Sequence, residues 1–476
     1  MKTDLLNWRK DKLKTMLVVF WLITVFSSFF GSVFSLTYLP GIGALYPFRI
    51  FLPITVLLYL AWMIREKYNP WKHASYVYRI CYVLCLCLVV YGGVSLFWAI
   101  DRAFTFRRWF NLCVDLCFFL LALELGKDKT VFLYTLRCIV PAILIHIVIG
   151  IVETFFGGVF FPCRDTYHNI TFFGKICHWP MSSTENTNDY SMMLVLALAM
   201  LLMYWAWRHH EEKCDWIPVS LIAPIYFLIR AGGARLCEVA FLVLLAGFVL
   251  YSITLKRKKR WILLSTILLL GFVVFGCNHK SLTEKVIQGV ELMAISADAA
   301  AIEEQAIPLS DKASMIDEFF VVDQETGELR ANQNGSAGIR LYLLMHALDC
   351  FMQSKGMGVG LGNAEQLAKV SEANSSGIWN IHCFLARMTA DFGIFFLVPL
   401  LLIVFALLHA CFKSMRQAVK ERNASNAMLW LLYLTVLISY PFASTAPSEA
   451  QDLLVMWLFL AGIVLFPMHM QKNEQE

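Results

Sequence analysis

Apolar segments long enough to cross a lipid bilayer recur along most of this sequence. A helix that spans the hydrocarbon core needs about 20 mostly apolar residues. Because 59% of the residues are apolar and only 16% are charged, a water-soluble domain could not bury them in one core. The sequence therefore predicts an all-α polytopic membrane protein with about twelve transmembrane helices, near residues 16–36, 45–64, 76–98, 108–125, 132–154, 188–207, 215–231, 236–255, 261–277, 384–412, 427–444 and 451–468.

The chain is expected to be one membrane domain with one large outer loop. Helices 1–9 would occupy residues 1–277, the loop 278–380 would carry part of the active site, and helices 10–12 would occupy residues 381–476. The first helix is expected to be retained, because FSLTYLPG has no small-residue cleavage site.

Basic residues in the short connections predict that both termini face the cytoplasm. REKYNPWKH, GKDKT, RHHEEK, KRKKR and KSMRQAVKER all fall on the expected inner side. One expected outer connection, WAIDRAFTFRRW, breaks this pattern with Arg102, Arg107 and Arg108. Two interpretations stay open: these arginines snorkel at helix ends, or they meet anionic groups such as a diphosphate.

Several classes of function are disfavoured by what the sequence lacks. The net charge of +5 is spread out, without the dense basic stripe that nucleic-acid binding requires. Most of the 14 cysteines lie in apolar segments, and only Cys163 and Cys177 share an outer loop where one disulfide is an open alternative. No metal or phosphate-loop motif is present, so no metal and no cofactor is expected.

Three arginines on the expected outer side could bind a phosphate group. Arg230 and Arg235 flank an Ala-Gly-Gly-Ala turn, and Arg340 lies in the large loop. A guanidinium group binds phosphate oxygens in pairs and keeps its charge, so these residues could hold a departing diphosphate. Snorkelling at the interface is the alternative for Arg230 and Arg235.

His382 is the acid–base candidate, because it precedes an apolar segment and imidazole titrates near neutral pH. The alternative is a hydrogen-bonded histidine at a helix start. Other histidines on the outer side are not ranked by sequence, namely His168, His178, His279 and His346. Costly polar residues within apolar segments are expected to pair with one another or to lie at helix ends, namely Asp115, Glu124, Arg137, His146 and Glu153.

Four motifs in this order resemble the O-antigen ligase and O-antigen polymerase superfamily of bacterial envelope glycosyltransferases. SSTENTNDYSMMLVLALAM resembles the family's entry to a middle helix and gives Asn188. RAGGARLCEVAFLVLLAG gives Arg235, and GSAGIRLYLLMHALDCFMQSKGMGVGLGN gives Arg340. IHCFLARMTADFGI resembles the histidine motif and gives His382, Asp391 and Gly393.

Two positions depart from that family pattern. Cys383 stands where the family usually has asparagine, and Ala234 stands where it usually has serine. Hydrogen bonds from these two neighbours are therefore not inferred from the family. The assignments of Arg235, Arg340 and His382 are kept.

The resemblance implies a metal-independent glycosyltransferase with a GT-C-like membrane fold in the bacterial cytoplasmic membrane. Arg235 and Arg340, with Arg230, would hold the diphosphate of a polyprenyl-linked glycan, and His382 would activate the acceptor hydroxyl. Asn188 and Asp391 would support the site. The expected partners are the lipid-linked donor, a glycan or lipid-linked acceptor, membrane lipid, a flippase and a chain-length regulator.

Three functions remain as alternatives at this point. The first is polymerisation of repeat units into a capsule, an exopolysaccharide or an O-antigen. The second is a ligase that moves a finished glycan onto a lipid A core or another envelope acceptor. A flippase or other transporter is a third, disfavoured because the polar candidates gather at the outer face and no repeat is evident.

Overall fold

The fold was examined in a computed structural model of the chain. It describes residues 11–39, 43–160, 170–210, 217–254, 266, 269–274, 276–279, 320–322, 329–331, 333, 336–371, 373–374, 376–445, 447 and 452–473.

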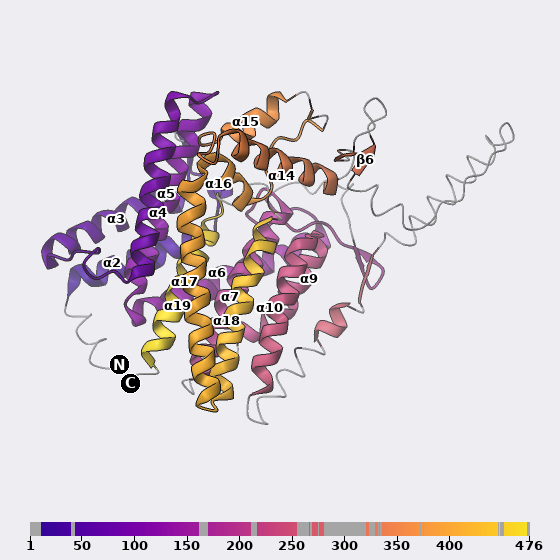
Figure 1. The fold of residues 1–476 in the computed structure, drawn as a ribbon. Coiled ribbons are helices and arrows are strands. Elements are labelled where there is room, and N and C mark those ends of the chain that lie inside the picture. The colour runs from indigo at the N-terminus through magenta and orange to yellow at the C-terminus, as the bar shows by residue number, and fades with distance from the viewer. Residues whose placement is uncertain are drawn as a thin grey trace.

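Long apolar helices make up most of the described chain (Figure 1). Nine helices among the described residues are long and apolar enough to cross a membrane, which confirms a multi-pass membrane protein. They are α3 (Pro47–Glu66), α4 (Tyr76–Val94), α5 (Arg102–Gly126), α6 (Lys129–Phe156), α7 (Thr187–His210), α10 (Arg235–Ile253), α17 (Ile394–Lys420), α18 (Ala424–Thr445) and α19 (Leu454–Asn473).

The other expected spans are shorter or incompletely described. The first is α2 (Lys12–Ser27), with 16 residues. The span expected at 215–231 is divided into α8 (Ile217–Ser220) and α9 (Ile222–Gly232). Most of the span expected at 261–277 lies outside the described residues, as does much of the large loop. A total of twelve helices therefore stays a prediction.

One expected span begins differently from the prediction. Residues 384–412 were expected to form one helix, but α16 (Phe384–Phe392) ends before Gly393 and α17 begins after it. Gly393 has a φ of +57°, which a continuous α-helix does not allow. The N–H of Ile394 instead donates to the carbonyl of Gly356 at 2.9 Å. The break is thus fixed by a contact with the glycine-rich turn.

The strands are short, and each described pair is antiparallel. Strands β1 (Thr37–Leu39) and β2 (Gly43–Leu45) form a hairpin that leads into α3. A three-stranded sheet has the order β4-β3-β5, from β4 (Lys175–Ile176), β3 (Ile170–Phe172) and β5 (Cys277–His279). A separate pair is formed by β6 (Phe320–Val322) and β7 (Leu329–Ala331). Two 3-10 turns are η1 (Ser32–Phe34) and η2 (Ser95–Phe97).

Helix α7 lies at the centre of the bundle. It is apolar on every side and buried along its length, as expected for a helix surrounded by others. It packs against α6, α9, α10, α18 and α19. Because α7 is fixed on all sides, the residues at its first turn have a defined position.

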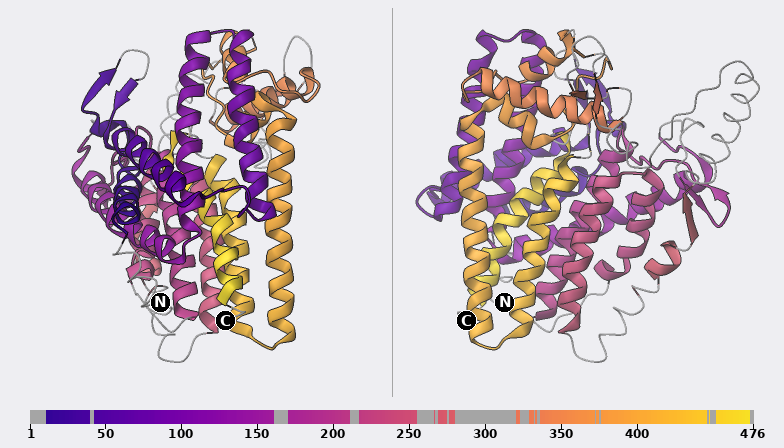
Figure 2. Two further views of the ribbon diagram at one scale, coloured as in Figure 1. Left: turned by 90° about the vertical axis from the view of Figure 1, so that its left-hand side faces the viewer. Right: turned by 45° about the vertical axis from the view of Figure 1, so that its right-hand side comes forward.

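Three helices of the second half form a layer across one end of the bundle (Figures 1 and 2). They are α14 (Ser336–Gln353), α15 (Asn363–Val370) and α16, and we call them the α14–α16 layer. Helix α14 packs on α15 and α16, while α16 also packs on α4, α17 and α18. The layer is therefore joined to helices from both halves of the chain.

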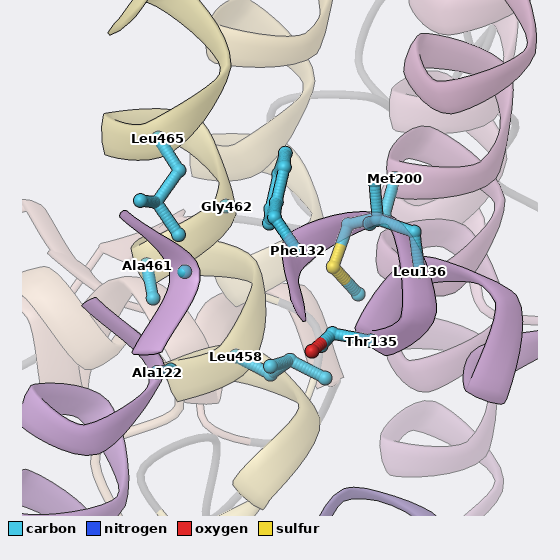
Figure 3. Close-up of a pocket in the computed structure, with 10 residues that line it drawn as sticks. Ala122, Phe132, Thr135, Leu136, Met200, Leu458, Ala461, Gly462 and Leu465 are labelled. Carbon is cyan, nitrogen blue, oxygen red and sulfur yellow. The ribbon is translucent and has the colours of Figure 1, made fainter. Parts of the chain in front are cut away.

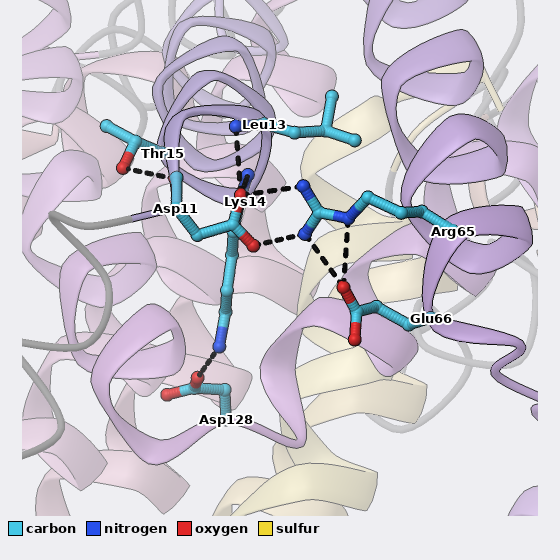
Figure 4. Close-up of polar contacts among 7 residues, drawn as sticks. All are labelled: Asp11, Leu13, Lys14, Thr15, Arg65, Glu66 and Asp128. Carbon is cyan, nitrogen blue, oxygen red and sulfur yellow. Dashed lines mark hydrogen bonds and ion pairs between the residues drawn. The ribbon is translucent and has the colours of Figure 1, made fainter.

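Charged residues tie together the start of α2, the end of α3 and the start of α6 (Figure 4). Lys14 of α2 lies 3.2 Å from Asp128, which precedes α6. Arg65, near the end of α3, pairs with Asp11 and Glu66. The segment before α2, the end of α3 and the α5–α6 connection were all predicted to be cytoplasmic. These three charged segments contact one another.

A small apolar cavity lies between α5, α6, α7 and α19 (Figure 3). Its volume of about 10 Å³ is near that of one water molecule. Thr135 is the one polar side chain in its lining, and its hydroxyl accepts a hydrogen bond from Trp21 at 2.8 Å. The cavity is too small for a sugar or a diphosphate.

Candidate functional site

The residues singled out from four separate motifs lie in the first two turns of helices or just before one. Asn188 is in the first turn of α7, and Arg235 is the first residue of α10. Arg340 lies in the second turn of α14, and His382 lies in the extended segment before α16. Arg235 is exposed, whereas the other three side chains are half-buried.

Arg340 lies within electrostatic range of both Arg235 and His382. Burial lowers the pKa of Arg340, and the neighbouring charge of Arg235 lowers it further, while Cys237 opposes the shift. Burial also lowers the pKa of His382 to about 4, with further contributions from Arg340 and Arg387. The structure therefore brings together a histidine and two arginines from three distant segments.

His382 is neutral at pH 7 on this basis. Its Nδ1 atom is buried and makes no hydrogen bond with any of the described residues. A neutral imidazole with an unused ring nitrogen is chemically suited to accept a proton. The surrounding positive charge disfavours the imidazolium until an anion neutralises that charge.

The start of α7 belongs to the same cluster. The N–H of Asn188 donates to the side-chain oxygen of Asn186 at 2.7 Å, which fixes the first turn. The next residue, Asp189, lies within electrostatic range of Cys237, as does Arg340. The motif that contains Asn188 therefore lies beside the start of α10.

Arg230 differs from the other two arginines because it already has a carboxylate partner. Its guanidinium lies 2.8 Å from Glu238, which also accepts a hydrogen bond from Tyr226 at 3.2 Å. Gly233, with a φ of +67°, reverses the chain between α9 and α10. The turn therefore gives Arg230 and Arg235 different surroundings. A diphosphate-binding role for Arg230 stays a prediction.

Asp391 is buried and holds the glycine-rich turn in place. Its carboxylate accepts hydrogen bonds from the main-chain N–H groups of Gly362, at 2.9 Å, and Ala364, at 3.3 Å. Burial raises the pKa of Asp391 to about 7, although both hydrogen bonds oppose this shift. These contacts join the start of α15 to α16. Asp391 thus fixes the glycine-rich turn to α16 away from solvent, and its supporting role in a site stays a prediction.

An ion-pair chain that sequence reasoning missed lies behind His382. The carboxylate of Glu365 lies 3.1 Å from Arg387 and 3.5 Å from Arg108. Arg108 also lies 3.0 Å from Asp452. Charged residues in polar segments carry no periodic pattern that could identify such partners. The one sequence feature that pointed to these ion pairs is the excess of arginine in WAIDRAFTFRRW.

That arginine excess has two different outcomes in the structure. Arg102 and Arg107 are exposed on α5. Arg108 is buried and paired with acidic residues, so it does not snorkel. A direct contact between Arg108 and a diphosphate stays untested.

The polar residues inside the apolar segments were expected to pair with one another or to lie at helix ends; four of the five have partners outside that set, and Glu124 and Glu153 lie in the last turns of α5 and α6. Glu124 pairs with Lys127 at 2.6 Å, and Arg137 donates to Tyr204 at 3.0 Å. His146 is hydrogen-bonded to Ser182 at 2.8 Å, and Glu153 accepts the main-chain N–H of Ser182 at 2.6 Å. These residues therefore have structural partners.

Some of the histidines and cysteines considered in the sequence are described by the structure, and others are not. His346 is hydrogen-bonded to the carbonyl of Ala364 at 2.9 Å. Cys163 and His168 lie outside the described residues, so the disulfide with Cys177 stays an open alternative. In the part of the chain that the structure describes, no group of three or more His, Cys, Asp or Glu side chains could hold a metal ion.

Comparison with known proteins agrees with this arrangement. The chain is 22% identical over 453 residues to "Teichuronic acid biosynthesis protein TuaE" of Bacillus subtilis (strain 168), covering 93% of this chain and 82% of that protein. Residues 236–401 match the family described as O-Antigen ligase. The matched segment contains Arg340, His382 and Asp391 and begins one residue after Arg235. The resemblance predicted from the four motifs is therefore confirmed as a match: residues 236–401 of this membrane protein are similar to the O-antigen ligase family.

Proposed function

We propose that this protein is a membrane glycosyltransferase of the GT-C type that polymerises lipid-diphosphate-linked oligosaccharide repeat units into a surface polysaccharide. One observation carries the proposal: Arg340 of α14 lies within electrostatic range of both Arg235 and His382, which come from two other segments of the chain. The family match and the relative named for teichuronic acid biosynthesis support it.

The proposed reaction follows from the charges of these residues. The acceptor hydroxyl attacks the anomeric carbon of the donor, and the bond between that carbon and the diphosphate oxygen breaks. His382 takes the hydroxyl proton, and Arg235 and Arg340 stabilise the negative charge that develops on the departing lipid diphosphate. The products are the new glycosidic bond, the lipid diphosphate and an imidazolium that returns its proton to solvent.

Neutral His382 suits this sequence of steps. Before the donor binds, Arg340 and Arg387 disfavour the imidazolium. The diphosphate brings negative charge that offsets these arginines, so the histidine becomes a better base when the donor is present. Proximity of the two glycans supplies much of the remaining rate enhancement.

The site would face the outer side of the bacterial cytoplasmic membrane, with both termini in the cytoplasm. The basic connections support this orientation, because α5 contacts the α14–α16 layer near its start, through Arg108 and Glu365, and ends just before Asp128 in the basic connection to α6.

Ligase activity is the second candidate, because the matching family is described as O-Antigen ligase. The two activities share the donor and differ in the acceptor: a repeat unit for the polymerase, and a lipid A core or another envelope acceptor for the ligase. Transport of the lipid-linked glycan is the third candidate.

The test uses purified protein in lipid vesicles with lipid-diphosphate-linked oligosaccharide extracted from cells that lack this protein. Products are separated by length for the parent, His382→Ala and Arg340→Ala. His409→Ala and Arg416→Ala are matched controls, because both side chains are exposed on α17 and lie outside the proposed site.

A ladder of products that is lost in His382→Ala and Arg340→Ala but kept in both controls supports the polymerase. One product that forms only with an added acceptor favours the ligase. Movement of the lipid across the bilayer without a new glycosidic bond overturns the glycosyltransferase.

A further inference from the structure

Helix α14 has two faces that are used within the fold. Leu343, Ala347 and Cys350 are buried, one helical turn apart, and Ala347 and Cys350 pack in a small apolar cluster with residues of α15 and α16. On a second face, the hydroxyl of Tyr342 donates to Ser371 at 3.3 Å, and His346 is bonded to Ala364. These contacts fix the helix on the layer.

The third face of α14 is apolar and exposed. Leu344, Met345, Leu348 and Met352 are 47%, 50%, 58% and 65% exposed. Their spacing puts them on one contiguous side of the helix, over a length of roughly 12 Å at 1.5 Å per residue. We call these four residues the α14 stripe.

Arg340 borders the α14 stripe. Leu344 and Leu348 lie four and eight residues after it on the same side of the helix. Arg340 is half-buried and within electrostatic range of Arg235 and His382. One helix thus presents, in order, a cation at the candidate site and an apolar track that begins one turn further on.

A polyprenyl diphosphate has a charged group followed by a long apolar chain, which is the same order as Arg340 followed by the α14 stripe. We propose that the α14 stripe binds the part of the donor's polyprenyl chain next to the diphosphate while Arg340 holds the diphosphate itself. This inference rests on the proposed function for the choice of substrate class. It adds a binding surface for the lipid portion of the donor.

The stripe would serve to align the donor. A diphosphate alone can rotate between Arg235 and Arg340, whereas a chain held along α14 fixes the direction from which the anomeric carbon approaches His382. Ordinary membrane lipid and a partner protein such as a chain-length regulator are the other occupants that an exposed apolar face admits. A polyprenyl chain, membrane lipid and a partner protein predict different dependences of binding on the length of the probe's apolar chain.

The test measures binding without any sugar or turnover. Protein in lipid nanodiscs is titrated with undecaprenyl diphosphate, which has a long chain, and with farnesyl diphosphate, which has a short one. The variants are Leu344→Asn/Leu348→Asn and Arg340→Gln. Val370→Asn is the matched control, because Val370 is an exposed apolar residue of α15 in the same layer.

We expect the parent to bind the long-chain probe more tightly. The double variant should lose about tenfold in affinity for the long-chain probe, because two large apolar contacts are replaced by polar ones, and should lose less for the short-chain probe. Val370→Asn should bind both probes as the parent does.

Three results would overturn this assignment. The parent could bind both probes equally, which would leave the stripe to membrane lipid. The double variant could bind the long-chain probe normally, which would leave the stripe to lipid or a partner protein. It could also lose both probes equally, which would mean general damage. Arg340→Gln is a separate measurement: if it binds both probes normally, the proposed diphosphate site fails, whatever the stripe does.

Discussion

The carboxylate of Glu365 lies 3.1 Å from the guanidinium group of Arg387, and both side chains are buried, at 1% and 3% exposed. Arg108 approaches the same carboxylate at 3.5 Å. One carboxylate therefore offsets two cations within the protein, at the point where α5, α15 and α16 meet. Removing one partner of a buried ion pair leaves an uncompensated charge, which costs more than the pair itself contributes.

Glu365→Gln should be strongly destabilising. It leaves Arg387 without its carboxylate, so the free energy of unfolding should fall by about 3–5 kcal/mol. Thermal unfolding in detergent measures this loss. Glu66→Gln is the control, because Glu66 forms a solvent-exposed pair with Arg65 that should contribute little. Equal changes in melting temperature for the two variants would contradict a stabilising role for the buried pair.

Arg387→Gln should change the pH dependence of the reaction. Burial, Arg340 and Arg387 together lower the pKa of His382 to about 4. Removing one of the two neighbouring positive charges raises that pKa, so the acid limb of the rate profile should move to higher pH. Arg387→Lys keeps the charge and should stay closer to the parent. The profile is measured between about pH 4 and pH 8.

Labelling of His382 with diethyl pyrocarbonate provides a second measurement that needs no substrate. The reagent modifies neutral imidazole, so the pH dependence of labelling reports the pKa of His382. If both the labelling and rate profiles of Arg387→Gln match those of the parent, Arg387 does not act on His382.

The membrane class could be predicted from sequence, and Arg340 and His382 could be proposed as site residues, because these signals are local. An apolar run of spanning length indicates a helix wherever it occurs. Arg340 and His382 stand in short motifs, so their selection required no knowledge of contacts. Their coupling across the fold is a result that only the structure provides.

The start of α17 and the ion pairs could not be predicted, because tertiary contacts determine them. The sequence around Gly393 is apolar on both sides, and the helix breaks there because the glycine turn hydrogen-bonds to Ile394. Arg230 and Arg235 were grouped because one turn joins them, yet Glu238 pairs with Arg230. Such pairings depend on which side chains the folded chain brings together.

Asp391→Asn should reduce the pH dependence of stability. Burial raises the pKa of Asp391 from 3.8 to about 7, so the folded protein favours the protonated form. Its stabilising contribution is present below pH 3.8 and is lost as pH rises through 7. Asparagine, like the protonated acid, cannot ionise, so the variant should lose less stability between about pH 5 and pH 8.

Melting temperatures of the parent and of Asp391→Asn at both pH values check this. His382 shifts in the opposite direction, but it is present in both proteins and cancels in the comparison. A difference between the two pH values that is the same in both proteins would mean that Asp391 ionises normally in the fold.

Gly358→Ala should impair both folding and activity more than Gly377→Ala in the same region. Gly358 has a φ of +86°, and an added Cβ would lie 2.5 Å from the carbonyl of Asp391 and 2.6 Å from the N–H of Gly393. Gly377 also has a positive φ, +68°, but its Cβ would meet open space. Both alanines therefore cost about 1–2 kcal/mol of backbone strain, and Gly358→Ala adds about 1–3 kcal/mol for displacing main chain.

Because the displaced main chain is the end of α16, the consequence should reach His382 at the other end of that short helix. Gly358→Ala should lower the rate of glycan transfer in protein that remains folded, whereas Gly377→Ala should leave that rate near the parent value. Melting temperature and rate are measured on the same preparations, so that loss of folded protein is separated from loss of activity. Equal melting temperatures and equal rates in the two variants would show that the contact between the glycine turn and α16 does not position the histidine.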